Sequence, residues 1–229
     1  MAKNFYAVRT GRTKGVFTSW DACKASVEGY AGAEYRGFNT EDEAYNYLNG
    51  NEVAVTNGVK VIIEKPKDEH TVNIYTDGSY KNGCVALGVF IEAKDRGFSF
   101  YGIVQCKEYQ SIANIAGELL GVLVGVQLAK DMGFSNINIY HDLQGVSSWY
   151  DGTFTARGAL QQLYVSLMNS LRLQYNLSYT FYKVKSHSGV NGNTIADRLA
   201  ARASNYKAYI DLNQILHGVL TVRDVPLLR

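Results

Sequence analysis

Four acidic residues and one histidine, spread between positions 77 and 197, have the types and local settings that a metal-dependent phosphodiesterase needs. They are Asp77, Glu118, Asp142, His187 and Asp197. Carboxylate oxygens are the hard ligands that Mg²⁺ prefers, and two such ions about 4 Å apart can activate a water and neutralise charge on a leaving oxygen. A nearby histidine can move a proton near neutral pH. These residues predict a hydrolytic site that uses two Mg²⁺ ions, with Mn²⁺ as a substitute.

Three of the carboxylates lie in contexts that would bring them together. Asp77 follows the β-rich run 72–76 and Asp142 closes the run 136–141, so we expect each at the carboxyl end of a strand. If those strands are parallel neighbours, the two side chains meet in the crevice where open α/β sheets bind ligands. Glu118 lies about two turns into an apolar helix, where a carboxylate is expensive to bury unless it is paired or coordinated.

Each of these residues also has an ordinary structural explanation. An aspartate before glycine, such as Asp77, is often a turn residue, and Asp142 can be the N-cap of a following helix. Asp197 can simply favour the dipole of its helix, and His187 can lie in a polar loop. Buried Glu118 is the residue that such explanations account for least well.

The elements expected around these residues begin with a small α+β domain over residues 1–50. Its strands are predicted at 5–10, 16–20 and 34–38. One helix follows Asp21, which we expect to cap it, and a second runs from Thr40 to Leu48. The sequence Thr40-Glu-Asp-Glu43 has the form of a capping box, which favours a helix start.

Residues 51–70 read as a linker, which marks a domain boundary. They contain Asn57-Gly58, Pro66 and the charged run 65–70 around one short apolar stretch, 59–63, which is the one strand-like part of the linker. We therefore expect a catalytic domain over 71–204. Residues 205–229 would be a C-terminal extension with one helix, whose apolar residues either pack on that domain or meet a partner.

The predicted catalytic domain has an α/β pattern. Its expected strands are 72–76, 85–93, 98–105, 136–141 and 177–184, and its expected helices are 112–132, 143–150, 159–175 and 193–203. Three antiparallel strands followed by alternating helices and strands predict a mixed five-stranded sheet with helices on both faces.

The stretch 112–129 is almost entirely apolar and carries glycines at 117, 121 and 125, a spacing that can also mark a membrane helix. Glu118 argues against a membrane span, because a carboxylate at a bilayer centre costs roughly 2.5–3.5 kcal/mol. We expect a buried helix whose glycines allow close approach to a sheet.

Composition narrows the class of protein further. With 229 residues, 46% of them hydrophobic and 19% charged, the chain can bury a substantial core, and wholesale disorder is excluded. The net charge of +2 is too mild to indicate nucleic-acid binding by itself. Cys23, Cys84 and Cys106 show neither zinc-ligand nor disulfide spacing, and the N-terminus has no signal-peptide core, so a cytoplasmic location is expected.

The acidic residues sit in five motifs that resemble, in order and spacing, those of type 1 ribonuclease H over residues 71–204. The motifs are Thr76-Asp77-Gly78-Ser79, Gly117-Glu118-Leu119-Leu120, Tyr140-His141-Asp142, Ser186-His187-Ser188-Gly189 and Asn193-Thr-Ile-Ala-Asp197. The resemblance implies the ribonuclease H fold and an endonuclease that cuts the RNA strand of RNA–DNA hybrids, leaving 3′-hydroxyl and 5′-phosphate ends.

The resemblance also implies a role for each residue of the site. Asp77 would bridge both ions, Asp197 would hold the water-activating one, and Glu118 and Asp142 would hold the other. His187 would assist proton transfer or product release.

Two positions depart from the family pattern, Leu143 after the third acid and Ile115 after Asn114. Asn114 itself matches a position that contacts the hybrid's minor groove. The basic protrusion of some bacterial relatives is missing, so the chain must grip its substrate elsewhere.

The first 50 residues contain the runs Phe5-Tyr-Ala-Val-Arg-Thr-Gly-Arg12, Gly15-Val-Phe-Thr-Ser-Trp20, Ala33-Glu-Tyr-Arg-Gly-Phe38 and Thr40-Glu-Asp-Glu-Ala44. With these runs they resemble the hybrid-binding, or viroplasmin-type, domain that precedes some ribonucleases H. The resemblance implies that Trp20 and Tyr35 pack on the DNA strand and that Tyr6 touches RNA 2′-hydroxyls, although all three can instead be core aromatics. Arg36 matches one of two adjacent basic residues, and Gly37 replaces the other. The predicted nucleic-acid contacts are Tyr6, Trp20, Tyr35, Arg36, Asn82 and Asn114.

Independently of the resemblance, the start of the chain is locally basic. Five cations face a single acid, Asp21, within the first 24 residues, and aromatic residues lie between them. The cations are Lys3, Arg9, Arg12, Lys14 and Lys24.

Three functions compete at this point. The first is a hybrid nuclease whose small domain grips while the larger one cuts. The second is a hybrid-binding scaffold without catalysis, and the third is a DNA recombinase or exonuclease, since fold alone does not fix the substrate. The first is favoured because no acid is lost and because the N-terminal domain is of the hybrid-binding type. RNA–DNA hybrid is the expected partner, with no membrane and no identifiable protein partner, and a monomer is expected.

Overall fold

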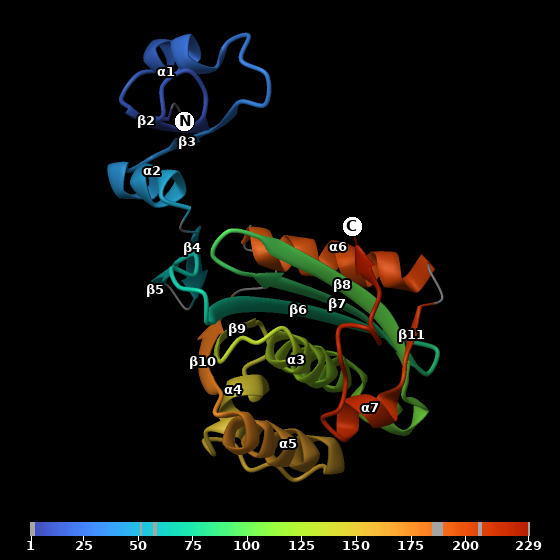
Figure 1. Cartoon of the computed structure of the whole chain (residues 1–229). Helices are drawn as coiled ribbons and strands as arrows, with labels where there is room; N and C mark the ends of the chain where they lie inside the picture. Colours follow the sequence, from blue (N-terminus) through green and yellow to red (C-terminus); the bar gives the residue numbers. More distant parts are fainter. Residues whose placement is uncertain (1–2, 51, 57–58, 185–189, 206–207, 229) are drawn as a thin grey trace. The chain divides into compact units, whose positions relative to one another are not determined.

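The computed structural model describes residues 3–50, 52–56, 59–184, 190–205 and 208–228 (Figure 1). The chain divides into two compact units, Met1–Lys65 and Pro66–Arg229. Each unit is described by itself.

The first unit is built on a three-stranded antiparallel sheet. Its order is β2 (Gly15–Phe17), β1 (Phe5–Thr10) and β3 (Glu34–Phe38). Helix α1 (Trp20–Val27) packs on the sheet through Cys23 and Val27, which lie against Val8. The predicted α+β character of this region is therefore confirmed.

The two helices of this unit both begin at a hydroxyl N-cap. The expectation that Asp21 caps α1 is wrong: the N-cap is Ser19, whose hydroxyl accepts a hydrogen bond from the amide of Ala22 at 3.3 Å, and Asp21 lies in the first turn. Helix α2 (Glu41–Leu48) begins as predicted, with the Thr40 hydroxyl accepting from the amide of Glu43 at 3.3 Å.

The segment expected to be a linker contains regular structure. Strands β4 (Glu52–Thr56) and β5 (Val59–Ile63) pair antiparallel in a two-stranded sheet of their own. The division between the units follows this hairpin, at Lys65 and Pro66. The prediction went wrong because the Asn57-Gly58 pair was taken as a break, although between two β-branched runs it is a strong hairpin signal.

The second unit is organised around a mixed sheet with helices on both faces, as predicted. The strand order is β10 (Ser178–Lys183), β9 (Asn136–His141), β6 (Thr71–Lys81), β7 (Cys84–Glu92) and β8 (Gly97–Gln105). Strands β6, β7 and β8 are antiparallel neighbours, whereas β9 pairs parallel with both β6 and β10.

Helices cover this sheet on its two sides. Helix α6 (Asn191–Asn205) lies on one face, and α3 (Ala113–Asp131) lies on the other, with α4 (Gly145–Tyr150) and α5 (Ala159–Tyr175) beyond it (Figure 1). A 3₁₀ helix, Lys107–Ile112, leads into α3.

The expected count of five strands is too low, because the C-terminal extension adds two short strands to the edge at β8. Strand β11 (Tyr209–Ile210) pairs parallel with β8, and β12 (Leu227–Leu228) pairs antiparallel with it. The tail thereby satisfies backbone groups that an open edge strand would leave exposed.

The tail is also fixed from inside the unit by Gln127 of α3, which is fully buried. Its side-chain amide donates to the carbonyl of Ile215 at 2.9 Å and accepts from the amide of Leu220 at 3.0 Å. Ile215 belongs to α7 (Leu212–Leu216), which packs near α3. Of the two alternatives, packing of the tail on the catalytic domain is the one observed.

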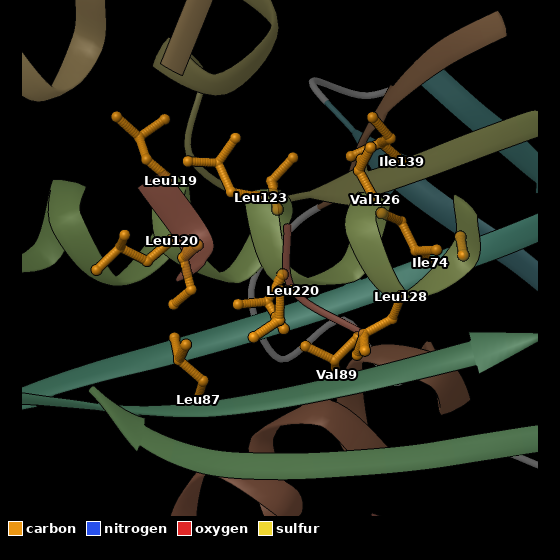
Figure 2. Close-up of a cluster of buried hydrophobic side chains, with 14 of the residues drawn as sticks. Ile74, Leu87, Val89, Leu119, Leu120, Leu123, Val126, Leu128, Ile139 and Leu220 are labelled. Atoms are coloured by element: carbon orange, nitrogen blue, oxygen red, sulfur yellow. The ribbon is translucent and has the colours of Figure 1, made fainter. Parts of the chain in front are cut away.

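Helix α3 is the buried helix that the sequence predicts. Its leucines and valines pack with Ile74, Leu87 and Val89 of the sheet (Figure 2). A Cβ atom added at Gly121 would lie 3.2 Å from Cβ of Thr76, and one added at Gly125 would lie 3.0 Å from Cδ1 of Ile74. The glycine stripe therefore faces β6. Among the described helices, none is long and apolar enough to cross a membrane.

Candidate functional site

Asp77 and Asp142 occupy matching positions on neighbouring parallel strands. The β6–β9 pairing runs in constant register to Tyr75 opposite Tyr140, so each aspartate stands two residues beyond that pair. The sequence predicted that Asp77 ends its strand, and this is wrong. Strand β6 continues to Lys81, and Asp77 pairs with Gly88 of β7. What ends before Asp77 is the pairing of β6 with β9, whose last paired residues are Tyr75 and Tyr140.

A contact between two glycines brings Glu118 to the same place. A Cβ atom added at Gly78 would lie 2.7 Å from the Cα of Gly117, and one added at Gly117 would lie 2.6 Å from the carbonyl oxygen of Gly78. The backbones of β6 and α3 therefore touch at this point. Because Asp77 precedes Gly78 and Glu118 follows Gly117, the contact sets the two carboxylates beside each other.

The electrostatics of Glu118 show that three carboxylates interact. Burial of the side chain, followed by the negative charges of Asp142 and Asp77, raises the pKa of Glu118 from 4.5 to about 9. In its protonated form Glu118 donates a hydrogen bond to Asp142, which raises the pKa further. The Oε2 atom of Glu118 is buried and has no hydrogen-bond partner. The expectation that Glu118 is costly to bury alone is confirmed.

The ordinary explanations of the aspartates do not hold in this structure. Asp77 lies within a strand rather than in a turn. The N-cap of α4 is Gln144, not Asp142. Asp197 is the seventh residue of α6, outside the first turn where the helix dipole acts.

Asp197 is placed differently from the other three acids. The helix that carries it packs on β7 at Gly88, where an added Cβ would meet the carbonyl oxygen of Ala196. Gly88 is the cross-strand partner of Asp77. Ala196, the residue before Asp197, therefore packs on the strand directly beside Asp77. The side chain of Asp197 is nevertheless exposed, and the carboxylates that act on Glu118 are Asp142 and Asp77.

Two of the predicted site residues lie outside what the structure describes. His187 belongs to the segment 185–189, and for Asn114 only the backbone is described, within α3. The two departures from the family pattern are described: Leu143 and Ile115 are partly buried and pack against the main hydrophobic core. Apolar residues at these positions are therefore used in packing.

His141 is a residue of the site that the sequence analysis passed over. Its ring is buried, and Nδ1 lies 3.0 Å from the carbonyl oxygen of Leu143, a hydrogen bond in which the ring nitrogen donates. This bond closes the turn that carries Asp142. Burial is the main reason why the pKa of His141 falls to about 4, so the ring is neutral at physiological pH. The available signal was its place in the sequence, directly before Asp142 at the end of a predicted strand.

The donor set fits hard divalent cations. The interacting groups are carboxylates, and the buried Oε2 of Glu118 is an oxygen that a cation would satisfy. In the described part of the chain, no three acidic, histidine or cysteine side chains are close enough to hold one ion as they stand. Binding a cation there requires Glu118 to lose its proton and the carboxylates to draw closer.

Three aromatic residues form an exposed cluster on the first unit. The ring centroids of Tyr6 and Trp20 are 5.5 Å apart, and those of Trp20 and Tyr35 are 5.9 Å apart. Trp20 and Tyr35 are 42% and 44% exposed, so neither is a core residue. Tyr6 is partly buried against the small core. The sequence left open whether Tyr6 is a core residue or a surface contact, and its position is intermediate between the two.

Two of the five early cations, Arg9 and Arg12, make hydrogen bonds to backbone carbonyl oxygens. Arg9 donates to the carbonyl oxygen of Tyr47 and stacks on that ring. Arg12 donates to the carbonyls of Ala25 and Glu28, near the end of α1. Arg9 is partly buried and so contributes little to a basic surface, whereas Arg12 is exposed and keeps its charge at the surface while it binds the end of α1.

Asn82 has a structural role in the β6–β7 hairpin. It adopts φ +53°, followed by Gly83 at φ +82°, between the paired residues Lys81 and Cys84. This is the Asn-Gly conformation that two-residue hairpin turns favour, so the residue type is explained by the turn itself. Contact between Asn82 and nucleic acid stays a prediction.

Comparison with known proteins gives family matches for both units. Residues 69–205 match the family described as RNase H, and residues 4–48 match the family described as Ribonuclease H1 N-terminal domain. The chain is 25% identical over 256 residues to Ribonuclease H1 of Rattus norvegicus, covering 86% of this chain and 87% of the rat protein.

Two further matches cover parts of the chain. Ribonuclease H of Saccharomyces cerevisiae is 49% identical over 45 residues, which are 20% of this chain and 13% of the yeast protein. The solved structure of RNase H1 from the archaeon Halobacterium salinarum NRC-1 has 20% identity and a TM-score of 0.48, and the match covers 59% of this chain and 98% of that one.

Proposed function

This chain belongs to the RNase H family, and we propose that it is an endonuclease that hydrolyses the RNA strand of RNA–DNA hybrids with two divalent cations, leaving 3′-hydroxyl and 5′-phosphate ends. The observation that carries the proposal is the burial of Glu118 beside Asp142 and Asp77. An acidic group with its pKa raised to about 9 by burial and by two like charges is unfavourable for stability and is what a cation site requires.

Asp77, Glu118, Asp142 and Asp197 are the residues that would hold Mg²⁺, with Mn²⁺ as a substitute. Cations bound there would polarise the scissile phosphate, lower the pKa of a water and neutralise charge on the leaving oxygen. The chain's own contribution is positional. The Gly78–Gly117 contact fixes Asp77 against Glu118, and the His141 ring holds the turn that carries Asp142. His187 is proposed to move a proton at the site or to assist product release.

The first unit supplies the grip on the substrate. Exposed Trp20 and Tyr35 offer flat faces to sugars and bases, and partly buried Tyr6 has a hydroxyl that can contact RNA 2′-hydroxyls. Because both units belong to one chain, binding by the first raises the effective concentration of hybrid at the second.

The decisive experiment is cleavage of matched RNA–DNA hybrid, double-stranded RNA and double-stranded DNA, with Mg²⁺, with Mn²⁺ or with a chelator. We expect metal-dependent cutting of the RNA strand of the hybrid only, with extendable 3′ ends. Binding without cleavage in any metal would identify a hybrid-binding scaffold. Equal cutting of DNA would identify a general nuclease, and either result would refute the proposal.

A further inference from the structure

The aromatic cluster of the first unit lies on one face of its sheet, and β3 contributes no cation to that face. Residues directly opposite one another in antiparallel strands point to the same side, and Tyr6 pairs with Gly37 while Val8 pairs with Tyr35. Tyr6, Tyr35 and Gly37 therefore share a face. Arg36, between the last two, points to the other face, where its guanidinium carbon lies 5.8 Å from the centroid of the Phe38 ring.

Lys3 occupies the space that Gly37 leaves open. A Cβ atom added at Gly37 would lie 3.0 Å from Cγ and 3.2 Å from Cβ of Lys3, and 3.3 Å from Cε1 of Tyr6. The aliphatic stem of Lys3 thus crosses the strand beside the Tyr6 ring. A larger residue at position 37 would displace it.

The charged end of Lys3 is exposed. Its ammonium donates to the side-chain oxygen of Asn39 at 3.1 Å, and the residue is exposed. Asn39 is neutral, so this hydrogen bond orients the ammonium without cancelling its charge. Among the other early cations, Arg9 is partly buried over the Tyr47 ring and Lys24 forms an ion pair with Glu28 at 3.5 Å, whereas Arg12 is exposed and donates to carbonyl oxygens near the end of α1.

We propose that Lys3 supplies the phosphate-binding cation of the aromatic face, lying across Gly37 to bind a backbone phosphate of the hybrid whose sugars pack on Trp20 and Tyr35. The inference rests on the function proposed above and adds a residue to it. Aromatic faces combined with a cation that follows the backbone are a common way to hold nucleic-acid strands without reading sequence. A lysine ammonium is suited to this as a point charge on a flexible stem.

The test is the salt dependence of binding, measured on the full chain with a short fluorescent RNA–DNA hybrid in chelator, so that no cleavage occurs. Each phosphate contact contributes roughly 0.7–0.9 to the slope of log affinity against log salt. Lys3→Gln should make the slope shallower by about that amount and weaken binding about two- to fivefold near 0.1 M salt. Lys94→Gln, the same charge change in the exposed β7–β8 turn, is the matched control and should leave the slope unchanged.

A double variant that moves the lysine from position 3 to position 37 tests whether a positive charge at this place on the sheet is what the substrate needs. Lys3→Gly/Gly37→Lys keeps composition and net charge, and removes both Lys3 atoms that a Cβ at position 37 would meet. It should restore the slope that Lys3→Gln loses. Amide hydrogen exchange in β1 and β3 checks that the first unit of each variant is folded.

The outcomes distinguish this inference from the proposed function. If the wild-type chain does not bind hybrid, the proposed function fails. If it binds and Lys3→Gln keeps the wild-type slope, or if Arg36→Gln alone flattens it, the assignment of Lys3 is overturned. A folded double variant that remains as shallow as Lys3→Gln would overturn it as well.

Discussion

The backbones of Gly78 and Gly117 touch, and this contact between β6 and α3 places Asp77 beside Glu118. The next two glycines of α3 continue the same line along β6, over Thr76 and Ile74. A helix with side chains at these positions would stand farther from the sheet, and Glu118 would be withdrawn from the two aspartates. Close packing and the candidate chemistry therefore have the same structural origin.

Gly117→Ala should impair both stability and cleavage. The added methyl would lie 2.6 Å from a backbone oxygen that cannot rotate away. Overpacking of this kind typically costs about 1–3 kcal/mol, against which alanine regains up to about 1 kcal/mol of helix propensity. Thermal unfolding and kcat on hybrid measure the two effects.

Gly121→Ala is the control for this change, because its methyl would meet the Thr76 side chain at 3.2 Å rather than backbone. It should be milder on both counts. Equal effects of the two substitutions would contradict the special role of the Gly78–Gly117 contact.

Asp77→Asn should abolish cleavage and preserve hybrid binding. An amide keeps the shape of the side chain but removes a charge that both cations are proposed to use. Removing that charge also takes away one of the causes of the high pKa of Glu118, so the pKa of Glu118 should fall. Single-turnover cleavage and binding isotherms test the first statement, and retained cleavage would remove Asp77 from the site.

Glu118 should make the metal-free protein less stable as pH rises. The pKa of Glu118 is about 9 in the folded chain, against 4.5 for an unperturbed glutamate. Between pH 4.5 and pH 9 the folded state therefore holds a proton that the unfolded state has lost. The resulting stabilisation is fully present below about pH 4.5 and is lost as pH rises through about 9. Asp142 and Asp77 are the charges that oppose its ionisation.

Glu118→Gln provides the comparison, since an amide does not titrate. The melting temperature of the variant minus that of the wild type, measured in chelator, should increase from about pH 5 to about pH 9. Adding Mg²⁺ should raise the melting temperature of the wild type more than that of the variant. A difference that is constant with pH would show that Glu118 is not protonated in the folded metal-free chain.

The sequence predicted the long, periodic elements well and the contributions of single side chains less well. Apolar runs and strand patterns specify β6 to β10, α3 and α5, because burial enforces them over many residues. The N-cap of α1 was misplaced because Ser19 and Asp21 are both good capping residues, and residue type alone does not select between them.

The same limit applies to the site. The acidic motifs identified Asp77, Glu118 and Asp142, but nothing local in the sequence shows that Arg9 is partly buried over the Tyr47 ring and donates to the carbonyl oxygen of Tyr47. The position of Lys3 across Gly37 depends on strand pairing, which a linear pattern does not contain. Contacts between residues distant in sequence are what the pattern leaves open.

Trp20→Ala should weaken substrate binding without slowing the chemical step. The side chain is exposed and lies between two other aromatic rings, so its removal leaves the small core intact. Loss of one stacking surface is worth about 1–3 kcal/mol, which corresponds to a rise in KM of roughly fivefold or more with kcat nearly constant. Tyr30→Ala, another exposed aromatic of the same unit outside this cluster, is the control. A fall in kcat with unchanged KM would contradict the proposed division of labour.

Gln127→Ala should loosen the C-terminal tail. The substitution leaves the carbonyl of Ile215 and the amide of Leu220 without the partners that now satisfy them. An unsatisfied buried polar group costs about 1–3 kcal/mol, and the lost packing of the side chain adds to this. The expected result is a lower melting temperature, together with faster amide exchange in β11, β12 and the segment between them. Gln162→Ala on the exposed side of α5 is the matched control and should leave both unchanged. If the tail of the Gln127 variant exchanged as slowly as that of the wild type, strand pairing with β8 alone would be sufficient to hold it.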